Sequence, residues 1–328
     1  MTVTIVNLQR IEKATKPTDL FPPGCDVDKV FRELAKTCHP DLAMPRLRAR
    51  ATAAHQKLSE FKTILLNHSH APTNFGEWFI KGPFEKGDIC DLYLADRGRS
   101  KEYIIKIARS ENDKDLMDRE RKNLGILTSD DSKEARNFQK YLPKLVDHFT
   151  ASRRPVHVFE LAEGYVSLDE ILSKVKLDFR HRVWMMNRLL SLLGYSHHNG
   201  IVHGAILPKH LLYHPKTHGM VLVDWCYSAN LKAGEHIPAV VKGNEALYPK
   251  EVRSKRPHLA TDIYMAARSL RLFCMNVPEQ FHPIFQWCLA ESPHSRPAKP
   301  WALQDRWIET AKKVYGEPKY IELVLPTN

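Results

Sequence analysis

The stretch that decides the fold runs I-V-H-G-A-I-L-P-K-H-L-L over residues 201–212, and V-L-V-D-W-C follows at residues 221–226. Apolar residues surround a few polar side chains in both segments, and three of those side chains can carry chemistry. His203 and His210 carry imidazole groups, which can act as general bases near neutral pH, and Asp224 carries a carboxylate. The role of these three side chains depends on the kind of protein, which the rest of the chain indicates.

The composition is that of a globular protein. The chain has 328 residues, of which 43% are hydrophobic and 27% are charged, a length that accommodates about two domains. No apolar run approaches the ~20 residues that span a bilayer, and the first ten residues lack the pattern of a secretory signal. Six cysteines occur without a CxxC pair, which predicts reduced, mostly buried thiols rather than a zinc site. We therefore expect a cytoplasmic protein with no membrane contact.

The net charge of +11 favours an anionic partner. An acidic protein surface and ATP are both candidates. Nucleic acid is disfavoured, because the sequence contains no RRM, zinc finger or comparable motif. The positive charge is spread along the chain, and its densest cluster lies within residues 46–57. The simplest interpretation of that cluster is the solvent-exposed face of a helix.

The N-terminal part of the chain predicts a small helical domain over residues 1–70. Apolar residues recur at helical spacing in residues 27–38 and again in residues 45–66. The tripeptide H-P-D at residues 39–41 ends the first of these helices, because proline disfavours helical geometry at the residue before it. Two helices joined by a short loop make a helical hairpin. A polar segment that contains a proline then predicts a linker over residues 71–78.

The sequence V-F-R-E-L-A-K-T-C-H-P-D at residues 30–41 resembles helix II and the HPD loop of a J-domain, the DnaJ-type co-chaperone module. Residues 58–65 resemble its helix III, whereas its aromatic first helix has only a faint counterpart in residues 17–21. In that family the HPD loop and the basic face of helix II engage a DnaK-type ATPase chaperone. Such an interaction needs a rigid turn and cations that complement an acidic surface. The positions that the resemblance assigns to this partner are Lys29, Arg32, Lys36, His39, Pro40 and Asp41.

The remainder of the chain predicts strands first and helices afterwards. Residues 92–95, 103–108 and 156–161 carry strand patterns, and residues 112–127 and 180–199 carry helical patterns. Strands followed by a run of helices indicate an α+β architecture with two lobes.

From about Phe79 to Tyr315 the motifs resemble those of the protein-kinase fold, in the same order. The resemblance places one lobe at residues 79–163 and the other at residues 164–328. Lys106 stands where kinases have the lysine that contacts the ATP phosphates, Glu120 where they have its glutamate partner, and Asp224 where they have the metal-binding aspartate. The resemblance thus implies ATP and magnesium as cofactors. It assigns ATP contacts to Gly87, Lys106, Glu120, Glu160 and Asp224, metal binding to Asp224, and structural roles to Glu251, Asp262 and Arg296.

The chain departs from the kinase pattern at the motifs that supply the catalytic base and the metal ligands. The family has H-R-D-L-x-x-x-N followed by D-F-G, in which the first Asp is the catalytic base and the Asn holds a metal ion. Ala205 occupies the position of the base, and it can neither orient a hydroxyl nor accept its proton. His210 replaces the asparagine, although imidazole is a poor ligand for magnesium. Trp225 and Cys226 replace the Phe and the Gly, so the loop loses a glycine hinge.

The loop that covers the phosphates in kinases is altered as well. The three glycines of G-x-G-x-x-G fall on Glu85, Gly87 and Cys90, and only the middle position is a glycine. Glu85 and Asp88 add negative charge near the expected phosphates, which is unfavourable for binding ATP.

Three functions stay open at this stage. The leading interpretation is a pseudokinase, a regulatory or binding protein that can hold ATP and is coupled to a DnaK-type chaperone. It names no catalytic residue. The second is a divergent but active ATP-dependent protein kinase or nucleotidyl transferase, in which His203 or His210 replaces the missing base. The third is an adaptor that uses no nucleotide and binds an acidic protein through its positive charge.

Overall fold

The computed structural model describes residues 5–14, 19–21, 27–68, 74–75, 78–98, 101–254, 258–274 and 276–326. The chain divides into two compact units, of which the first comprises Met1–Lys86 and Asp91–Ile105 and the second comprises Gly87–Cys90 and Lys106–Asn328. Most of the predicted linker, at residues 71–73, 76 and 77, lies outside the described residues. The predicted boundary between two lobes at residue 163 stays a prediction.

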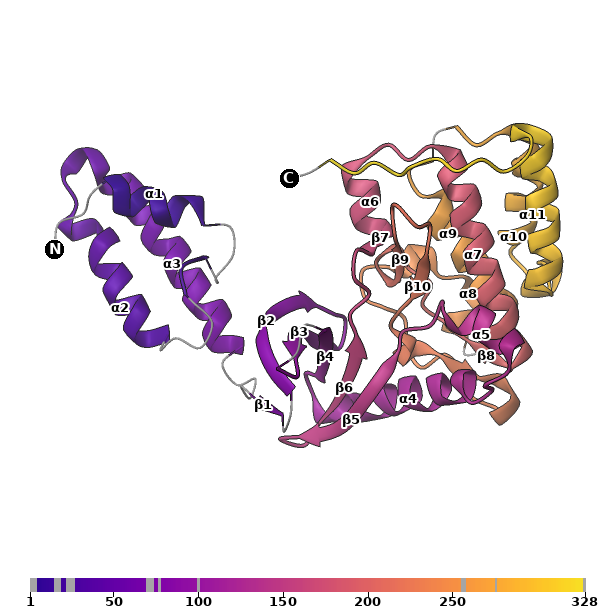
Figure 1. Ribbon diagram of the computed structural model, residues 1–328, viewed down its shortest axis with the longest axis horizontal. Coiled ribbons are helices and arrows are strands. Elements are labelled where there is room, and N and C mark those ends of the chain that lie inside the picture. Colours follow the sequence, from indigo (N-terminus) through magenta and orange to yellow (C-terminus); the bar gives the residue numbers. More distant parts are fainter. Residues whose placement is uncertain are drawn as a thin grey trace. The chain divides into compact units, whose positions relative to one another are not determined.

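Three helices form the N-terminal part of the first unit: α1 (Ile5–Lys13), α2 (Val27–Cys38) and α3 (Arg48–His68). Helix α2 has the bounds that its apolar spacing predicts, and a 3-10 turn (Pro45–Leu47) precedes α3 within the second predicted helix. All three pack against one another, as Figure 1 shows. They enclose a core of their own, which includes Leu8, Ile11, Leu20, Phe21, Cys38, Ala51, Ala54 and Leu58.

The sequence did not predict α1. Leu8 and Ile11 of this helix are fully buried, and the carboxylate of Glu12 accepts hydrogen bonds from the guanidinium of Arg50 at 2.9 and 2.7 Å. The amine of Lys57 also donates to the main-chain carbonyl of Glu12 at 2.8 Å. Isolated helices shorter than about 12 residues are marginal in water. The stability of α1 therefore comes from its contacts with α3, which the local sequence pattern does not reveal.

Strands of the first unit follow one another as sheet neighbours in the order β1 (Asn74–Phe75), β2 (Trp78–Lys86), β3 (Cys90–Asp96) and β4 (Glu102–Ala108). The β1–β2 and β2–β3 pairs are antiparallel, and β2 is bulged. Strands β3 and β4 confirm the two strands predicted at residues 92–95 and 103–108. Along the chain, β3 begins in the second unit and β4 ends there.

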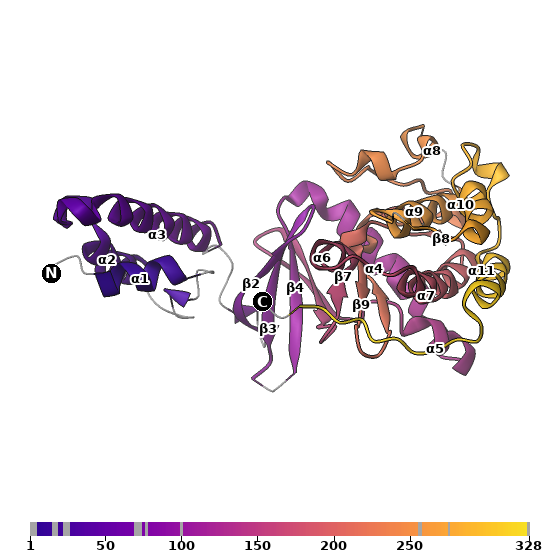
Figure 2. The same ribbon diagram turned by 90° about the horizontal axis from the view of Figure 1, so that it is seen from above.

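The second unit combines short antiparallel sheets with many helices, as seen in Figure 2. Its helices α4 and α7 and its strand β6 confirm the elements predicted at residues 112–127, 180–199 and 156–161. Strands β7, β8, β9 and β11 were not predicted, because each has only two or three residues and shows no alternation of its own. The elements are β5 (Leu145–Ala151), β6 (Arg154–Glu160), β7 (Val166–Ser167), β8 (Ile201–Val202), β9 (Leu211–Tyr213), β10 (Met220–Leu222), β11 (Ala229–Asn230), α4 (Lys114–Thr128), α5 (Lys133–Gln139), α6 (Leu168–Lys174), α7 (Phe179–His198), α8 (Lys250–Arg253), α9 (Ala260–Arg271), α10 (His282–Cys288) and α11 (Pro300–Tyr315).

Helix α7 runs through the core of the second unit. Met185, Leu189 and Leu193 lie on it and are fully buried. Helix α11 packs along α7, where the indole of Trp307 donates to the main-chain carbonyl of Val183 at 3.0 Å. This core fixes the segments that leave α7, including the stretch at residues 201–212. The architecture is α+β, as the order of elements predicted. None of the described helices has the length and apolar character needed to cross a membrane.

Candidate functional site

Strand β4, helix α4 and the segment after β10 bring Lys106, Glu120 and Asp224 together within the second unit. The amine of Lys106 lies 2.9 Å from Oε1 of Glu120 and 2.6 Å from Oδ1 of Asp224. Both the lysine and the glutamate are buried. The three residues that the sequence singled out as a phosphate and metal set thus form one connected ion-pair cluster.

Two further residues complete this cluster, and the sequence did not point to them. Nδ1 of His157 on β6 lies 2.9 Å from Oε2 of Glu120, and Sγ of Cys226 lies 3.2 Å from the amine of Lys106. The amine of Lys106 therefore sits among Glu120, Asp224 and Cys226, three side chains that could otherwise share a metal ion. The ammonium group already supplies the positive charge that this group of ligands requires. The only sequence signal for His157 was a polar residue within an apolar strand.

The charges of this cluster hold one another in the ionised state. Burial alone would lower the pKa of Lys106, but the negative charges of Asp224 and Glu120 raise that pKa well above its ordinary value. Burial would likewise raise the pKa of each carboxyl group, yet the nearby ammonium of Lys106 keeps the pKa of Glu120 and of Asp224 below the usual range. Near neutral pH the site therefore presents one ammonium group between two carboxylates.

A left-handed backbone at Asp224, with φ 63° and ψ 62°, turns the chain into the segment that follows β10. Aspartate tolerates this conformation better than most residues. The next residue, Trp225, is fully buried, and its indole donates to the carbonyl of Leu222 at 2.8 Å. Its main-chain N–H donates to Oε1 of Glu120 at 3.1 Å. A buried tryptophan thus fixes the position where the kinase pattern has a phenylalanine followed by a glycine.

The loop at residues 203–210 is held by the carboxylate of Asp262 on α9. Its oxygens accept hydrogen bonds from the main-chain N–H groups of His203 at 2.8 Å and Gly204 at 2.9 Å. Nε2 of His197 lies 3.0 Å from the same carboxylate. All of these groups are buried, and Asp262 therefore positions the main chain that leads to Ala205.

Both ring nitrogens of His203 have main-chain hydrogen-bond partners. Its Nε2 lies 3.1 Å from the carbonyl of Val223, and its Nδ1 accepts from the main-chain N–H of Ala205 at 3.2 Å. Burial disfavours the imidazolium form and lowers the pKa of His203 to about 4. The imidazole is neutral near pH 7, and neither of its ring nitrogens is left to take a proton from a substrate.

Gly204 shows that the loop differs from the kinase pattern by more than the loss of one carboxylate. Its φ is +74°, a conformation that favours glycine, and a Cβ atom there would lie 2.7 Å from the main-chain oxygen of Tyr227. The kinase pattern has an arginine at this position. The backbone of this chain therefore leaves no room for that side chain in the same conformation.

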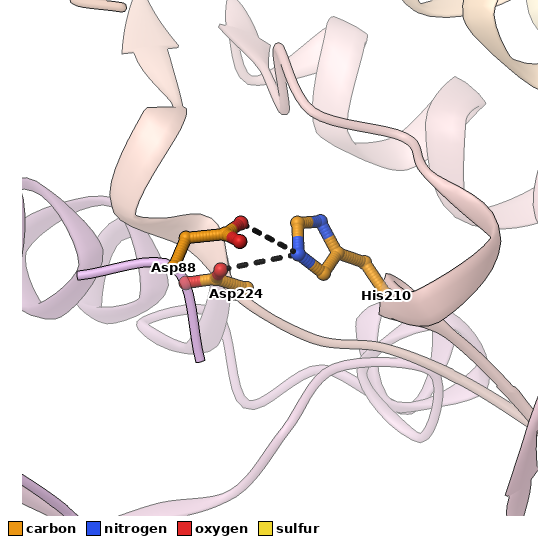
Figure 3. A group of neighbouring side chains, drawn as sticks. All are labelled: Asp88, His210 and Asp224. Carbon is orange, nitrogen blue, oxygen red and sulfur yellow. Dashed lines mark ion pairs between the residues drawn. The ribbon is translucent and has the colours of Figure 1, made fainter. Parts of the chain in front are cut away.

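Asp88 and His210 join Asp224 in a second group of side chains, which Figure 3 shows. Nε2 of His210 lies 3.2 Å from Oδ2 of Asp224 and 3.5 Å from Oδ2 of Asp88. The amine of Lys209 pairs with the other oxygen of Asp88. The sequence marked Asp88 only as an unfavourable charge near phosphates, and it gave no role to Lys209.

The turn that carries Asp88 links β2 to β3 and contains Gly87. The main-chain N–H of Gly87 donates to the carbonyl of Cys90 at 3.0 Å, so the turn is short and closed. The guanidinium of Arg109 donates to the carbonyls of Gly87, Asp88 and Cys90. The segment predicted to cover the phosphates therefore forms a compact turn that directs Asp88 toward His210.

The other predicted residues lie in separate places. Glu160 ends β6, and its carboxylate pairs with the amine of Lys144 at 2.7 Å. The carboxylate of Glu251 on α8 binds the guanidinium of Arg296 through two hydrogen bonds, as the kinase resemblance implies. In the first unit, Lys29, Arg32 and Lys36 are exposed on α2, and the loop His39-Pro40-Asp41 follows that helix directly.

Comparison with known proteins finds protein kinases. The serine/threonine-protein kinase H1 homolog of Pinctada fucata is 26% identical over 121 residues, which cover 36% of this chain and 29% of that protein. Serine/threonine-protein kinase D of Synechocystis sp. is 29% identical over 129 residues, covering 38% of this chain and 25% of that protein. Serine/threonine-protein kinase B of the same organism is 25% identical over 164 residues, which cover 46% of this chain and 26% of that protein.

The matched part thus spans between 25% and 29% of the length of each of these relatives. No protein-family model matches the chain. The similarity to the kinases and the α+β architecture together define a protein-kinase-like fold.

Proposed function

We propose that this chain is a pseudokinase-type regulatory or binding protein that holds ATP together with a divalent cation. The observation that carries the proposal is the state of the loop around Ala205. Ala205 is fully buried and has no group that accepts a proton, and His203 next to it is neutral and has both ring nitrogens in hydrogen bonds. The kinase reaction uses an aspartate at this position to accept the hydroxyl proton. The loop therefore lacks the group that makes a protein kinase active.

The cluster of Lys106, Glu120 and Asp224 supports the binding part of the proposal. A lysine that is fixed by a buried glutamate can contact phosphate oxygens, and an ionised aspartate beside it can hold a metal ion. Asp224 would supply the oxygen ligand that magnesium prefers, whereas the imidazole of His210 does not fit that ion. Gly87 would approach the phosphates, and the segment that begins at Glu160 would receive the adenine. Bound ATP would then favour one conformation of the protein over another.

Thermal unfolding with and without ATP, ADP and magnesium tests nucleotide binding. A ligand that binds only the folded state stabilises it by about 2.7 kcal/mol at 100 times its Kd, so we expect a rise in the unfolding midpoint that requires magnesium. The rise should disappear in Lys106→Met and in Asp224→Asn. Lys313→Met is the matched control, because Lys313 pairs with Glu309 on the surface of α11. An unchanged midpoint at millimolar nucleotide would leave the adaptor function, in which positive charge alone recruits an acidic partner.

We propose in addition that the N-terminal helices couple this protein to a DnaK-type chaperone. The structure places the tripeptide His39-Pro40-Asp41 in a loop between α2 and α3, where the side chain of Asp41 is 87% exposed and that of His39 is 44% exposed. Lys29, Arg32 and Lys36 recur at helical spacing on α2 and are exposed. An exposed turn beside a cationic helix face is suited to an acidic partner surface.

Stimulation of the ATPase of a DnaK-type chaperone tests this coupling. We expect the full chain to accelerate ATP hydrolysis by the chaperone, and His39→Gln and Arg32→Ala to reduce the acceleration strongly. Arg48→Ala is the matched control, since Arg48 is an exposed arginine at the start of α3. Equal acceleration by the wild type and by His39→Gln would exclude a role of this loop.

A further inference from the structure

Two carboxylates in the second unit share the same arrangement around His210. In Asp224, Oδ1 pairs with the amine of Lys106 at 2.6 Å, and Oδ2 lies 3.2 Å from Nε2 of His210. In Asp88, Oδ1 pairs with the amine of Lys209, and Oδ2 lies 3.5 Å from the same nitrogen. Each carboxylate therefore pairs one oxygen with a lysine. Figure 3 shows that the other oxygen of each carboxylate faces the same imidazole nitrogen.

The hydrogen bond at the far side of the ring fixes which nitrogen of His210 carries the proton. Nδ1 lies 2.8 Å from the main-chain carbonyl of Ala205. A carbonyl oxygen only accepts hydrogen bonds, so Nδ1 must be the donor. In the neutral ring the lone pair then lies on Nε2 and faces the two carboxylate oxygens. Histidines that bind metals characteristically donate their other ring N–H to a carbonyl or carboxylate in this way.

The second carboxylate oxygen of Asp88 provides an independent observation about this arrangement. Among the described residues, its Oδ2 is buried and has no hydrogen-bond partner. A buried polar atom without a partner is costly and calls for an explanation. Three ligand atoms, one each from Asp88, His210 and Asp224, lie within 4.8 Å of one another. One cation between them would give the unpartnered oxygen a ligand bond and remove the repulsion among the three.

We propose that Asp88, His210 and Asp224 bind a divalent first-row transition ion, with Zn²⁺ as the preferred ion, directly and without nucleotide. One imidazole nitrogen and two carboxylate oxygens suit Zn²⁺, which commonly has three protein ligands and one open position for water. Magnesium requires oxygen ligands and gives up its water reluctantly, so the nitrogen of His210 selects against it. The turn held by Arg109 presents Asp88 to the site before any ion arrives.

The test uses the full chain after removal of metal by a chelator, in a buffer that contains no nucleotide. Isothermal titration with ZnCl₂ should give one ion per chain, and a large excess of magnesium should not compete. Asp88→Asn and His210→Ala should each weaken the affinity at least about tenfold, because each removes one of three ligands. His282→Gln is the control, since His282 is an exposed histidine of α10. Co²⁺ in place of Zn²⁺ should give a visible absorption spectrum that Asp88→Asn changes.

Three results would overturn the proposal: less than one ion per chain, an affinity that neither variant changes, or displacement of Zn²⁺ by magnesium. The first result would mean that the three side chains do not form an ion site. The second would place the ion on other side chains, such as a cysteine or a surface histidine. Asp88 lies in a turn, so Asp88→Asn decides the matter even if His210→Ala fails to fold. Because no nucleotide is present, the outcome does not depend on whether ATP binds.

Discussion

Two buried groups of charges in the second unit differ in how completely their atoms are partnered. Around Arg296, the guanidinium binds both oxygens of Glu251, and it also donates to the carbonyls of Ala290 and Glu291 at 2.8 and 2.9 Å. Around His210, two carboxylate oxygens and one ring nitrogen face one another, and one of these oxygens has no hydrogen-bond partner among the described residues. The first group is complete within the protein, whereas the second leaves one buried oxygen without a hydrogen bond among the described residues.

This difference separates the parts of the kinase pattern that keep the fold from the parts that perform its chemistry. Glu251, Arg296 and Asp262 hold main-chain segments in place, and their buried charges would be costly without their partners. Ala205 and His210 stand where the pattern has a base and a metal ligand. Both side chains are buried in the structure. Our proposal is that this chain keeps the scaffold of a kinase without its reaction, and each of the following experiments tests one side of that contrast.

Arg296→Met should have the largest effect on stability. It leaves the carboxylate of Glu251 buried without its cation, and breaking a buried ion pair in this way costs about 3–5 kcal/mol. Chemical denaturation of the variant and the wild type measures the free energy of unfolding. Lys250→Met is the control, because Lys250 pairs with Glu291 at a position where both side chains are largely exposed. Equal stability of Arg296→Met and the wild type would show that this ion pair does not hold the fold.

Asp262→Ala should destabilise the protein by about 2–4 kcal/mol, because it leaves the buried N–H groups of His203 and Gly204 without an acceptor. Asp305→Ala on the exposed side of α11 should change the free energy of unfolding little. Hydrogen exchange of the amides of His203 and Gly204 gives a second readout, since both should exchange faster in Asp262→Ala. Unchanged protection of these two amides would contradict the role assigned to Asp262.

His203 should make the free energy of unfolding depend on pH. This effect should be smaller than those of the two substitutions above. The pKa of His203 is lowered to about 4 in the folded protein, whereas an unfolded histidine titrates near pH 6.5. Between these values the unfolded chain binds a proton that the folded chain does not, so the free energy of unfolding falls as the pH drops from about 6.5 toward 4. At pH 5 the loss amounts to about 2 kcal/mol.

The measurement compares unfolding of the wild type and His203→Gln at several pH values from 7.5 to 5. Glutamine keeps a donor and an acceptor at the position but does not titrate, so the variant should lose this part of the pH dependence. Parallel curves for the two proteins would mean that His203 is not buried as a neutral ring.

The sequence predicted the helices and strands better than it predicted the contacts of the candidate site around Asp224, for a physical reason. Strands β3 and β4 and helices α2, α4 and α7 follow from local patterns of apolar residues, and such patterns lie within one segment of chain. Arg109, His157 and Lys209 act through contacts with residues far away in the sequence, which no local pattern encodes. Asp88 was recognised as a charge near the site, but its orientation toward His210 depends on a turn that only the structure shows.

The most direct test of the account is transfer of phosphate from radiolabelled ATP by the purified chain. The reaction is run with magnesium, manganese or zinc, with general acceptor proteins and with the chain itself as acceptor, beside Lys106→Met. The account predicts bound ATP but no labelled protein above the level of Lys106→Met, because Ala205 supplies no base and His203 is neutral and fully hydrogen-bonded. Stoichiometric labelling of wild type that Lys106→Met abolishes would contradict it, and would establish an active transferase that uses another group in place of the base.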